Sequence, residues 1–168
     1  LTDSSAASDV YKRQVYGQER FSKRIAKNIV KSRENSPIVN TFDLVNIINR
    51  SVLVNDKNKH NATRSFQALR IYVNKELDVL RDILEKSHDI LAPKGRLVLI
   101  SYHSLEERVI KDFLFYSDRN LSTPRKMPIK NDFMKKMFNI IKKIKPSKTE
   151  IDANPRSRSA KINVLEKQ

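Results

Sequence analysis

The sequence predicts an α/β fold, in which helices cover a sheet. A long helical segment, Thr63–Leu91, is followed by the apolar run Leu97–Ile100 and by a further helix, Leu105–Tyr116. A helix that leads into an unbroken apolar strand and then into another helix is typical of a parallel sheet buried on both faces. We therefore expect Leu97–Ile100 to be an interior strand.

The scarcity of glycine indicates that this α/β fold is incomplete. The chain contains only two glycines, Gly17 and Gly95. An α/β enzyme that grips a nucleotide-like cofactor uses several glycines where its backbone meets the ligand. Gly95 follows Pro93 at the expected end of a helix, and Gly17 opens a basic helix, so neither lies in a cofactor loop. The sequence predicts the back half of such an enzyme without its cofactor-gripping half.

The overall charge points to a polyanionic partner. Among 168 residues, 34 Lys and Arg stand against 19 Asp and Glu, which gives a net charge of +15. A field of that sign favours nucleic acid, although a sequence rich in Lys, Asn and Ile is also consistent with an ordinary solvated surface. The absence of Cys excludes disulfides and thiolate metal sites. No metal site is predicted, since His60 and His88 lack suitably spaced partners.

The first part of the chain reads as a leader followed by two helices. Residues 1–14 show no periodicity and resemble translated sequencing-adapter text, so we expect a disordered, non-native leader. The segment Glu19–Arg33 places its apolar residues on one helical stripe. Thr41 is expected to cap a short helix that turns Leu44, Val45 and Ile48 inward, and Asn55–Asn61 reads as a loop.

The long helical segment and the C-terminal part supply the remaining elements. Thr63 is a plausible N-cap, and the apolar residues of the segment recur at three- and four-residue steps: Phe66, Leu69, Val73, Leu77, Leu80, Leu84 and Leu91. Beyond a loop at Ser117–Asp132, Phe138–Ile144 and Lys161–Glu166 read as strands that pair antiparallel at a sheet edge. Between them, Ser147 and Glu150 form a possible capping box.

Three uncommon polar strings carry a family resemblance. They include His60-Asn61-Ala62-Thr63-Arg64-Ser65-Phe66-Gln67, Ser101-Tyr102-His103-Ser104-Leu105-Glu106-Glu107 (within a string that runs from Gly95 to Arg108) and Asn154-Pro155-Arg156-Ser157-Arg158-Ser159-Ala160-Lys161. In this order and spacing they resemble the ribosomal small-subunit methyltransferase H family, also called MraW. The match runs from about Val15 to the C-terminus and covers only the second half of the family pattern.

The resemblance implies a fold, an activity and a partner. It implies S-adenosylmethionine-dependent methylation of N4 of a cytidine in small-subunit ribosomal RNA, at the decoding centre, with that RNA or the small ribosomal subunit as partner. It implies an incomplete class I, Rossmann-like methyltransferase domain with a helical inserted domain. On this basis residues 15–61 are part of the insertion and residues 62–168 are the C-terminal part of the Rossmann-like domain.

The resemblance also implies what these residues lack. The family's Gly-Gly-His cofactor loop, its ribose-binding acid and its Asp-Leu-Gly-Val-Ser strand all precede the matched region. No cofactor-binding residue is therefore assigned, and S-adenosylmethionine is expected to bind the full-length parent but not this chain alone. The sequence departs from the family pattern at Asn61, Lys94 and Tyr102, where the family usually has Pro, Gly and Phe.

His103 is the candidate catalytic residue. It lies in the polar break after the strand Leu97–Ile100, where an open α/β sheet presents its ligand contacts. Either His103 lines the target-base side of the cleft, or its imidazole fixes the strand-to-helix turn and caps the following helix. The neighbouring acids Glu106 and Glu107 are expected at the N-terminus of that helix, where the dipole favours negative charge.

Nine polar residues are candidates for RNA contact. They fall into three sets: Arg20, Lys23 and Arg24 on a basic helix face; Arg64, Gln67 and Arg70 on adjacent turns of one helix; and Arg156, Arg158 and Lys161 before the last strand. Guanidinium groups suit phosphate because they bind it in a bidentate manner. For each set the alternative is structural, namely a solvated face, ion pairs that tie the helix down, or bracing of the backbone.

Two function classes remain open from the sequence. One is the truncated methyltransferase, inactive on its own, and the other is a non-enzymatic basic module that binds RNA or ribosomes. No apolar run approaches the roughly 20 residues that span a bilayer, and no signal-peptide pattern is present. We therefore expect no membrane association and a cytoplasmic location.

Overall fold

The computed structural model describes residue 10 and residues 14–53, 60–117 and 137–168. The chain divides into two compact units, residues 1–76 and 77–168. The expected leader (residues 1–14) and the expected loops at Asn55–Asn61 and Ser117–Asp132 fall largely outside the described residues. The domain boundary expected at residue 61 stays a prediction, since a compact unit and an inserted segment need not end at the same residue.

The first unit is helical. Helices α2 (Ser22–Asn35) and α3 (Thr41–Ser51) pack through Ile25, Ile29 and Ile48, as the apolar stripes predict. The cap of α3 differs from the expectation: Asn40, not Thr41, accepts the amide of Asp43, and the Asp43 carboxylate accepts the amide of Asn40 in return. Asn is as good an N-cap as any residue. The helix therefore begins at Thr41 itself, one residue earlier than a cap at Thr41 would place it.

The prediction of one continuous helix over Thr63–Leu91 is wrong. It is two helices, α4 (Thr63–Asn74) and α5 (Glu76–Ile90), separated by Lys75 in the left-handed region (φ 51°). The Lys75 amide bonds the carbonyls of Ile71 and Tyr72, which closes α4 as a left-handed C-cap. The expected N-cap Thr63 is also corrected, because Thr63 is the first helical residue and Ala62 is the cap, without a side-chain bond.

The second unit contains a three-stranded sheet of order β1-β3-β2, formed by β1 (Arg96–Ser101), β2 (Phe138–Ile144) and β3 (Lys161–Lys167). Both pairs of neighbours are antiparallel. The pairing of the last two strands is confirmed, whereas the parallel sheet is wrong for the described strands. The physical reason is the position of β3 between the other two strands. β1 and β2 run in the same direction, as a strand–helix–strand pattern predicts, but β3 separates them and pairs with both.

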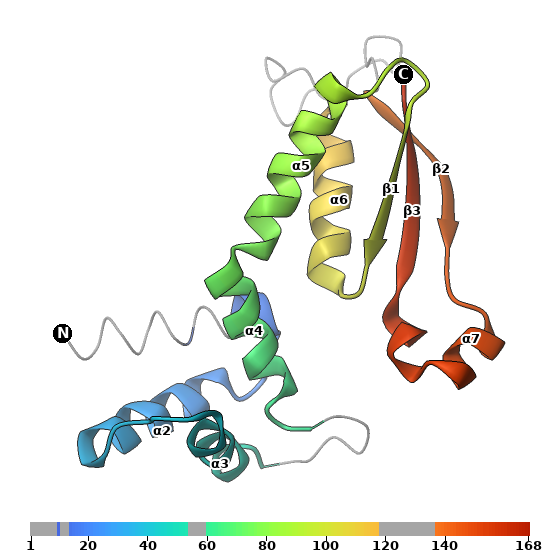
Figure 1. The fold of residues 1–168 in the computed structure, drawn as a ribbon. Coiled ribbons are helices and arrows are strands. Elements are labelled where there is room, and N and C mark those ends of the chain that lie inside the picture. Colours follow the sequence, from blue (N-terminus) through green and yellow to red (C-terminus); the bar gives the residue numbers. More distant parts are fainter. Residues whose placement is uncertain (1–9, 11–13, 54–59, 118–136) are drawn as a thin grey trace, which may run out of the picture. The chain divides into compact units, whose positions relative to one another are not determined.

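Helices cover one face of this sheet. Helices α5 and α6 (Ser104–Ser117) lie beside the strands, while α7 (Lys148–Ala153) and the 3₁₀ turn η2 (Pro155–Ser159) connect β2 to β3 (Figure 1). Val109 and Ile110 of α6 are buried, as is Leu165 of β3, and the centroid of the Phe138 ring lies 5.7 Å from that of the Phe113 ring. The expected cap Ser147 is confirmed, since its hydroxyl accepts the amide of Glu150.

The other face of the sheet contradicts the prediction that Leu97–Ile100 is an interior strand buried on both faces. The run Leu97–Ile100 is in a strand, but the side chains of Val98 and Ile100 are 58% and 57% exposed. Leu97 and Leu99 are half-buried. Within the described residues the strand is therefore covered on one face only, because α5 and α6 both lie on that side.

Candidate functional site at the end of the first strand

The turn between β1 and α6 is held by reciprocal hydrogen bonds. His103 Nδ1 accepts the backbone amide of Glu106 at 3.3 Å, and the Glu106 carboxylate accepts the amides of Tyr102 and His103 at 2.7 and 3.2 Å. This is the capping-box arrangement with histidine as the cap. The structural alternative for His103 therefore has direct geometric support.

The second ring nitrogen of His103 is differently placed. Because Nδ1 accepts a hydrogen bond, the neutral ring carries its proton on Nε2. Nε2 is buried and has no hydrogen-bond partner among the described residues, although it lies 3.3 Å from Glu106 Oε1 in a poorly aligned geometry. A buried donor without a partner costs free energy, so an acceptor that reached this nitrogen would be stabilising.

A buried polar cluster lies directly behind the turn. Glu107 Oε1 accepts the hydroxyl of Ser101 at 2.5 Å and the amide of Asn163 at 2.7 Å. Its other oxygen, Oε2, lies 3.9 Å from the ammonium of Lys161. Since these residues come from α6, β1 and β3, the cluster joins the helix to the ends of two strands.

The environment of Glu107 favours its charged form. Burial raises the pKa of Glu107, but the hydrogen bonds from Ser101 and Asn163 and the positive charges of Lys161 and Lys143 lower the pKa by more, so that it lies below the ordinary value of 4.5. A buried carboxylate with this set of donors is a satisfied structural group. It fixes the carboxyl end of β1, from which Tyr102 and His103 project.

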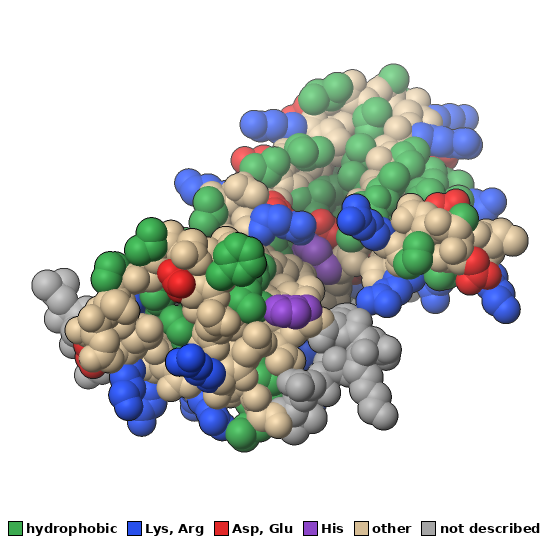
Figure 2. Space-filling model, turned by 60° about the horizontal axis from the view of Figure 1, so that its bottom comes forward, with side chains coloured by type: hydrophobic (Ala, Val, Ile, Leu, Met, Phe, Trp, Pro, Cys, Tyr) green, Lys and Arg blue, Asp and Glu red, His purple; other side chains and the backbone are tan. Residues whose placement is uncertain are grey.

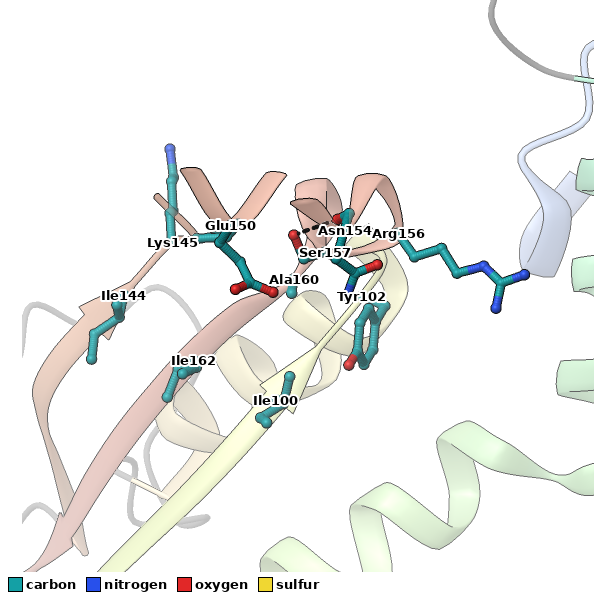
Figure 3. Close-up of a pocket in the computed structure, with 11 residues that line it drawn as sticks. Ile100, Tyr102, Ile144, Lys145, Glu150, Asn154, Arg156, Ser157, Ala160 and Ile162 are labelled. Atoms are coloured by element: carbon teal, nitrogen blue, oxygen red, sulfur yellow. Dashed lines mark hydrogen bonds between the residues drawn. The ribbon is translucent and has the colours of Figure 1, made fainter. Parts of the chain in front are cut away.

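A cavity of about 620 Å³ opens at the same end of the sheet. Isoleucines of all three strands form its apolar side, and the polar groups of Tyr102, Glu150 and Asn154 line it opposite them (Figure 3). In Figure 3 the side chains of Lys145 and Arg156 extend away from its centre. An apolar hollow with a few convergent polar groups is the usual form of a small-molecule or base site.

The third candidate set of basic residues lies at this end of the sheet, but Lys161 faces Glu107 on the α6 side rather than the cavity. Arg156 lines it and is exposed, and Arg158 is exposed on the same 3₁₀ turn. Lys161 begins β3, and its side chain is 47% exposed beside Glu107. The structure thus brings the third candidate set together at one end of the sheet.

The basic residues of the first unit lie on two helices. Lys23 and Arg24 are exposed in the first turn of α2, and Arg20 is exposed just before the helix. On α4, Arg64 and Gln67 are half-buried, whereas the Arg70 guanidinium pairs with Glu76 at 2.8 Å. Figure 2 shows Lys and Arg side chains distributed over the visible face rather than in one patch.

The glycines do not fit an S-adenosylmethionine site. A side chain at Gly17 would lie 2.6 Å from the carbonyl oxygen of Arg64, and one at Gly95 would lie 2.7 Å from that of Ala92. Both glycines therefore permit close packing of the chain on itself. In the parts of the chain that the structure describes, no group of three His, Cys, Asp or Glu residues is arranged to hold a metal ion.

Sequence reasoning missed the Glu107 cluster and the polar side of the cavity. The available signal was Asn163, which shares a strand face with the buried Leu165 and therefore needed a polar partner. Its partner is 56 residues away along the chain, beyond the reach of local patterns.

None of the described helices is long and apolar enough to cross a membrane.

Comparison with known proteins places the chain in a family. The profile of the MraW methylase family matches residues 5–168, a match that begins before Val15. The chain is 47% identical over 154 residues to the ribosomal RNA small subunit methyltransferase H of Herminiimonas arsenicoxydans, covering 90% of this chain and 48% of that protein. It is 45% identical over 153 residues to the protein of the same name in Legionella pneumophila (strain Corby), of which it covers 50%. The chain thus spans about half the length of these relatives, and it belongs to the MraW methylase family.

Proposed function

We propose that this chain is part of an S-adenosylmethionine-dependent methyltransferase that modifies N4 of a cytidine in small-subunit ribosomal RNA. The observation that carries the proposal is the family membership over residues 5–168. The proposed fold is the C-terminal part of a class I, Rossmann-like domain, residues 62–168, with residues 15–61 as part of a helical insertion. The proposed partner is the RNA of the small ribosomal subunit, and the proposed location is the cytoplasm.

The end of β1 supports a role in placing the target base. Methyl transfer to an exocyclic amine is largely a problem of position, and a base in structured RNA must first leave its stack. We propose that His103 lines the base side of the cleft, with its Nε2 proton as the contact. The capping bond to Nδ1 supports this assignment, because it fixes both the tautomer and the direction of the ring.

The basic sets are proposed as RNA contacts of unequal kind. Arg20, Lys23, Arg24, Arg156 and Arg158 are exposed and suit phosphate contact. Arg64 and Gln67 are half-buried and suit a single directed hydrogen bond to RNA. Arg70 and Lys161 already face carboxylates, so their contact with RNA would be shared with a structural role.

The chain alone is proposed to be inactive, because its glycines are committed to internal packing. Titration calorimetry with S-adenosylmethionine tests this. The 168-residue chain should give no measurable heat of binding. A chimera, in which the chain replaces the matching half of the Herminiimonas arsenicoxydans relative, should bind the cofactor. Tight binding of S-adenosylmethionine by the isolated chain would contradict the proposal that the chain alone is inactive for lack of a cofactor site.

A second candidate is a non-enzymatic RNA-binding module. The observation that favours it is the net charge of +15, which supports RNA binding without any cofactor. The chimera separates the two candidates: an RNA-binding module predicts unchanged RNA affinity and no methyl transfer after the missing half is supplied.

A further inference from the structure

A second hollow lies in the helical unit, between α2 and α3. Its volume is about 290 Å³, and the two helices that form it pack side by side (Figure 1). Four of its residues come from one face of α2 and two from α3: Asn28, Lys31, Ser32, Asn35, Ile47 and Arg50. We name this hollow the α2–α3 groove, and none of its residues belongs to the three sets of predicted RNA contacts.

Hydrogen bonds between and along the helices hold the groove in shape. Asn28 Nδ2 donates to the hydroxyl of Ser51 at 2.8 Å, and that hydroxyl donates to the carbonyl of Ile47 at 2.6 Å. Ser51 is fully buried, so this chain of bonds ties α2 to α3. Asn35 Nδ2 donates to the carbonyl of Lys31 at 3.0 Å. The groove is therefore a preformed feature of the packed helix pair.

The α2–α3 groove carries positive charge without a compensating acid. Lys31 and Arg50 line it from the two helices, and both are exposed. Neither forms an ion pair with any residue in the described ranges, and none of the six lining residues is acidic. The carboxylate of Asp43, in the first turn of α3, accepts the amides of Val39 and Asn40 instead. Two unneutralised cations that line one hollow favour an anion between them.

The size and lining of the groove select the part of a nucleic acid that fits. At about 290 Å³ it is smaller than the sites that enclose a whole small-molecule ligand, which measure about 300–1,000 Å³. Its described lining includes no aromatic side chain, and Ile47 is the only apolar residue in it. It therefore lacks a surface on which a base would stack. Cations, a hydroxyl and amides suit a phosphate group instead.

The groove continues a row of cations along α2. Arg24, Lys27 and Lys31 are exposed, and residues at three- and four-residue steps share one face of a helix. The row extends over about 10 Å of helical rise. A single small anion could occupy only one point of such a row, whereas a chain of phosphates can follow it. The row therefore favours a polyanion over a free phosphate ion.

We propose that the α2–α3 groove holds one backbone phosphate of the RNA substrate, between the Arg50 guanidinium and the Lys31 ammonium. The inference rests on the proposed function, since the RNA is the partner proposed there. The planar guanidinium binds two phosphate oxygens at once, and the ammonium adds a point charge from the opposite helix. The Ser32 hydroxyl donates a further hydrogen bond. Such a contact carries no base specificity and sets the position of the RNA on the helical unit.

Equilibrium binding of a fluorescein-labelled fragment of small-subunit ribosomal RNA tests the groove. Fluorescence anisotropy gives the affinity of the 168-residue chain over a series of salt concentrations. The variants are Lys31→Gln, Arg50→Gln and the double substitution Lys31→Gln/Arg50→Gln. The matched control is Arg81→Gln/Lys86→Gln, which removes the same charge from exposed positions of α5. Thermal unfolding checks that each variant folds, and the single variants carry the test if the double variant does not fold.

One shared phosphate predicts a specific pattern of losses. The groove double variant should bind the RNA at least about ten-fold more weakly at about 0.15 M salt, and the magnitude of its salt slope should fall by about 1, as expected for loss of one phosphate contact. Each single variant should cause a large part of that loss, so that the two losses do not add. The α5 control should change the affinity by less than about two-fold, because salt at this concentration screens charges that do not contact the RNA.

Equal losses from the groove and control variants would overturn the proposal, because only the overall charge would then matter. Unchanged RNA affinity in the groove double variant would overturn it as well, and additive losses from the single variants would mean that Lys31 and Arg50 do not share a phosphate. Methyl transfer by the unsubstituted chimera is a separate readout. A chimera that binds RNA through the groove but transfers no methyl group would count against the proposed methyltransferase and not against the groove.

Discussion

His103 uses one ring nitrogen for the cap of α6 and keeps the other buried and without a hydrogen-bond partner among the described residues. The cap alone explains why a polar residue stands at this turn. It does not explain why the residue is histidine, since Asn or Ser caps a helix as well. The Nε2 donor is the part of the side chain that an Asn cap does not supply.

Substitution of His103 separates these two roles. His103→Asn should retain the cap and cost only a few tenths of a kcal/mol of unfolding free energy, whereas His103→Ala should cost about 1 kcal/mol. In the chimera both variants should lose methyl transfer if Nε2 contacts the base, as measured by incorporation of labelled methyl groups. Near-normal turnover in His103→Asn would confine His103 to the structural role.

Glu107 makes a testable contribution to stability through its hydrogen bonds. Glu107→Gln replaces a carboxylate that accepts two hydrogen bonds from buried donors, and should lower the free energy of unfolding by about 1–3 kcal/mol at neutral pH. Urea denaturation of the chain measures this difference. Glu85→Gln, at an exposed position of α5, is the control and should change stability little.

The pH dependence of that difference follows from the direction of the pKa shift. The folded pKa of Glu107 lies below its ordinary value of 4.5. Its electrostatic contribution is therefore fully present above pH 4.5, and it is lost as the pH falls through the lower folded pKa. The gap between wild type and Glu107→Gln should narrow in that acidic range. A gap that widens on acidification would show that the sign is wrong.

At the scale of elements, the sequence predicts those features that depend on residues close to one another along the chain. The bounds of β2 and the positions of α6 and β3 follow from periodicity and capping. The pairing of β1 does not, because no local pattern reveals that β3 lies between β1 and β2. The candidate site divides in the same way: the position of His103 after a strand was predictable, but the bond between Glu107 and Asn163 depends on the tertiary fold.

The break between α4 and α5 is the element that local patterns hid most completely. The apolar spacing continues through Lys75, but Val73 is 72% exposed, so the stripe does not belong to one continuous helix. Lys75 adopts a left-handed conformation that costs a residue with a Cβ roughly 1–2 kcal/mol. The cap geometry compensates for that cost through the bonds of its amide.

Glycine at this break should be stabilising. Lys75→Gly relieves the left-handed conformation and should raise the free energy of unfolding by about 0.5–1 kcal/mol, after the larger backbone entropy of glycine in the unfolded chain is subtracted. Lys86→Gly, in the interior of α5, should instead cost about 1 kcal/mol. Thermal or urea denaturation gives both values. Destabilisation by Lys75→Gly equal to that by Lys86→Gly would mean that α4 and α5 are one helix in solution.

At the scale of the whole molecule, the charge predicts how RNA binding depends on salt. Affinity for a small-subunit RNA fragment should fall linearly on a log–log plot against salt concentration. Arg156→Ala should reduce the magnitude of the slope by about 1, as expected for loss of one phosphate contact. Arg81→Ala is the control, because Arg81 pairs with Asp78 at 2.6 Å and lies outside the proposed contacts. Equal slopes for wild type and Arg156→Ala would remove Arg156 from the RNA surface.

Transfer of a labelled methyl group from S-adenosylmethionine to small-subunit ribosomal RNA measures the proposed function of the assembled molecule. The chimera should place the label on N4 of a cytidine, and the 168-residue chain alone should transfer none. The contradicting result is a chimera that folds, binds the cofactor and RNA, and still leaves every cytidine unmodified.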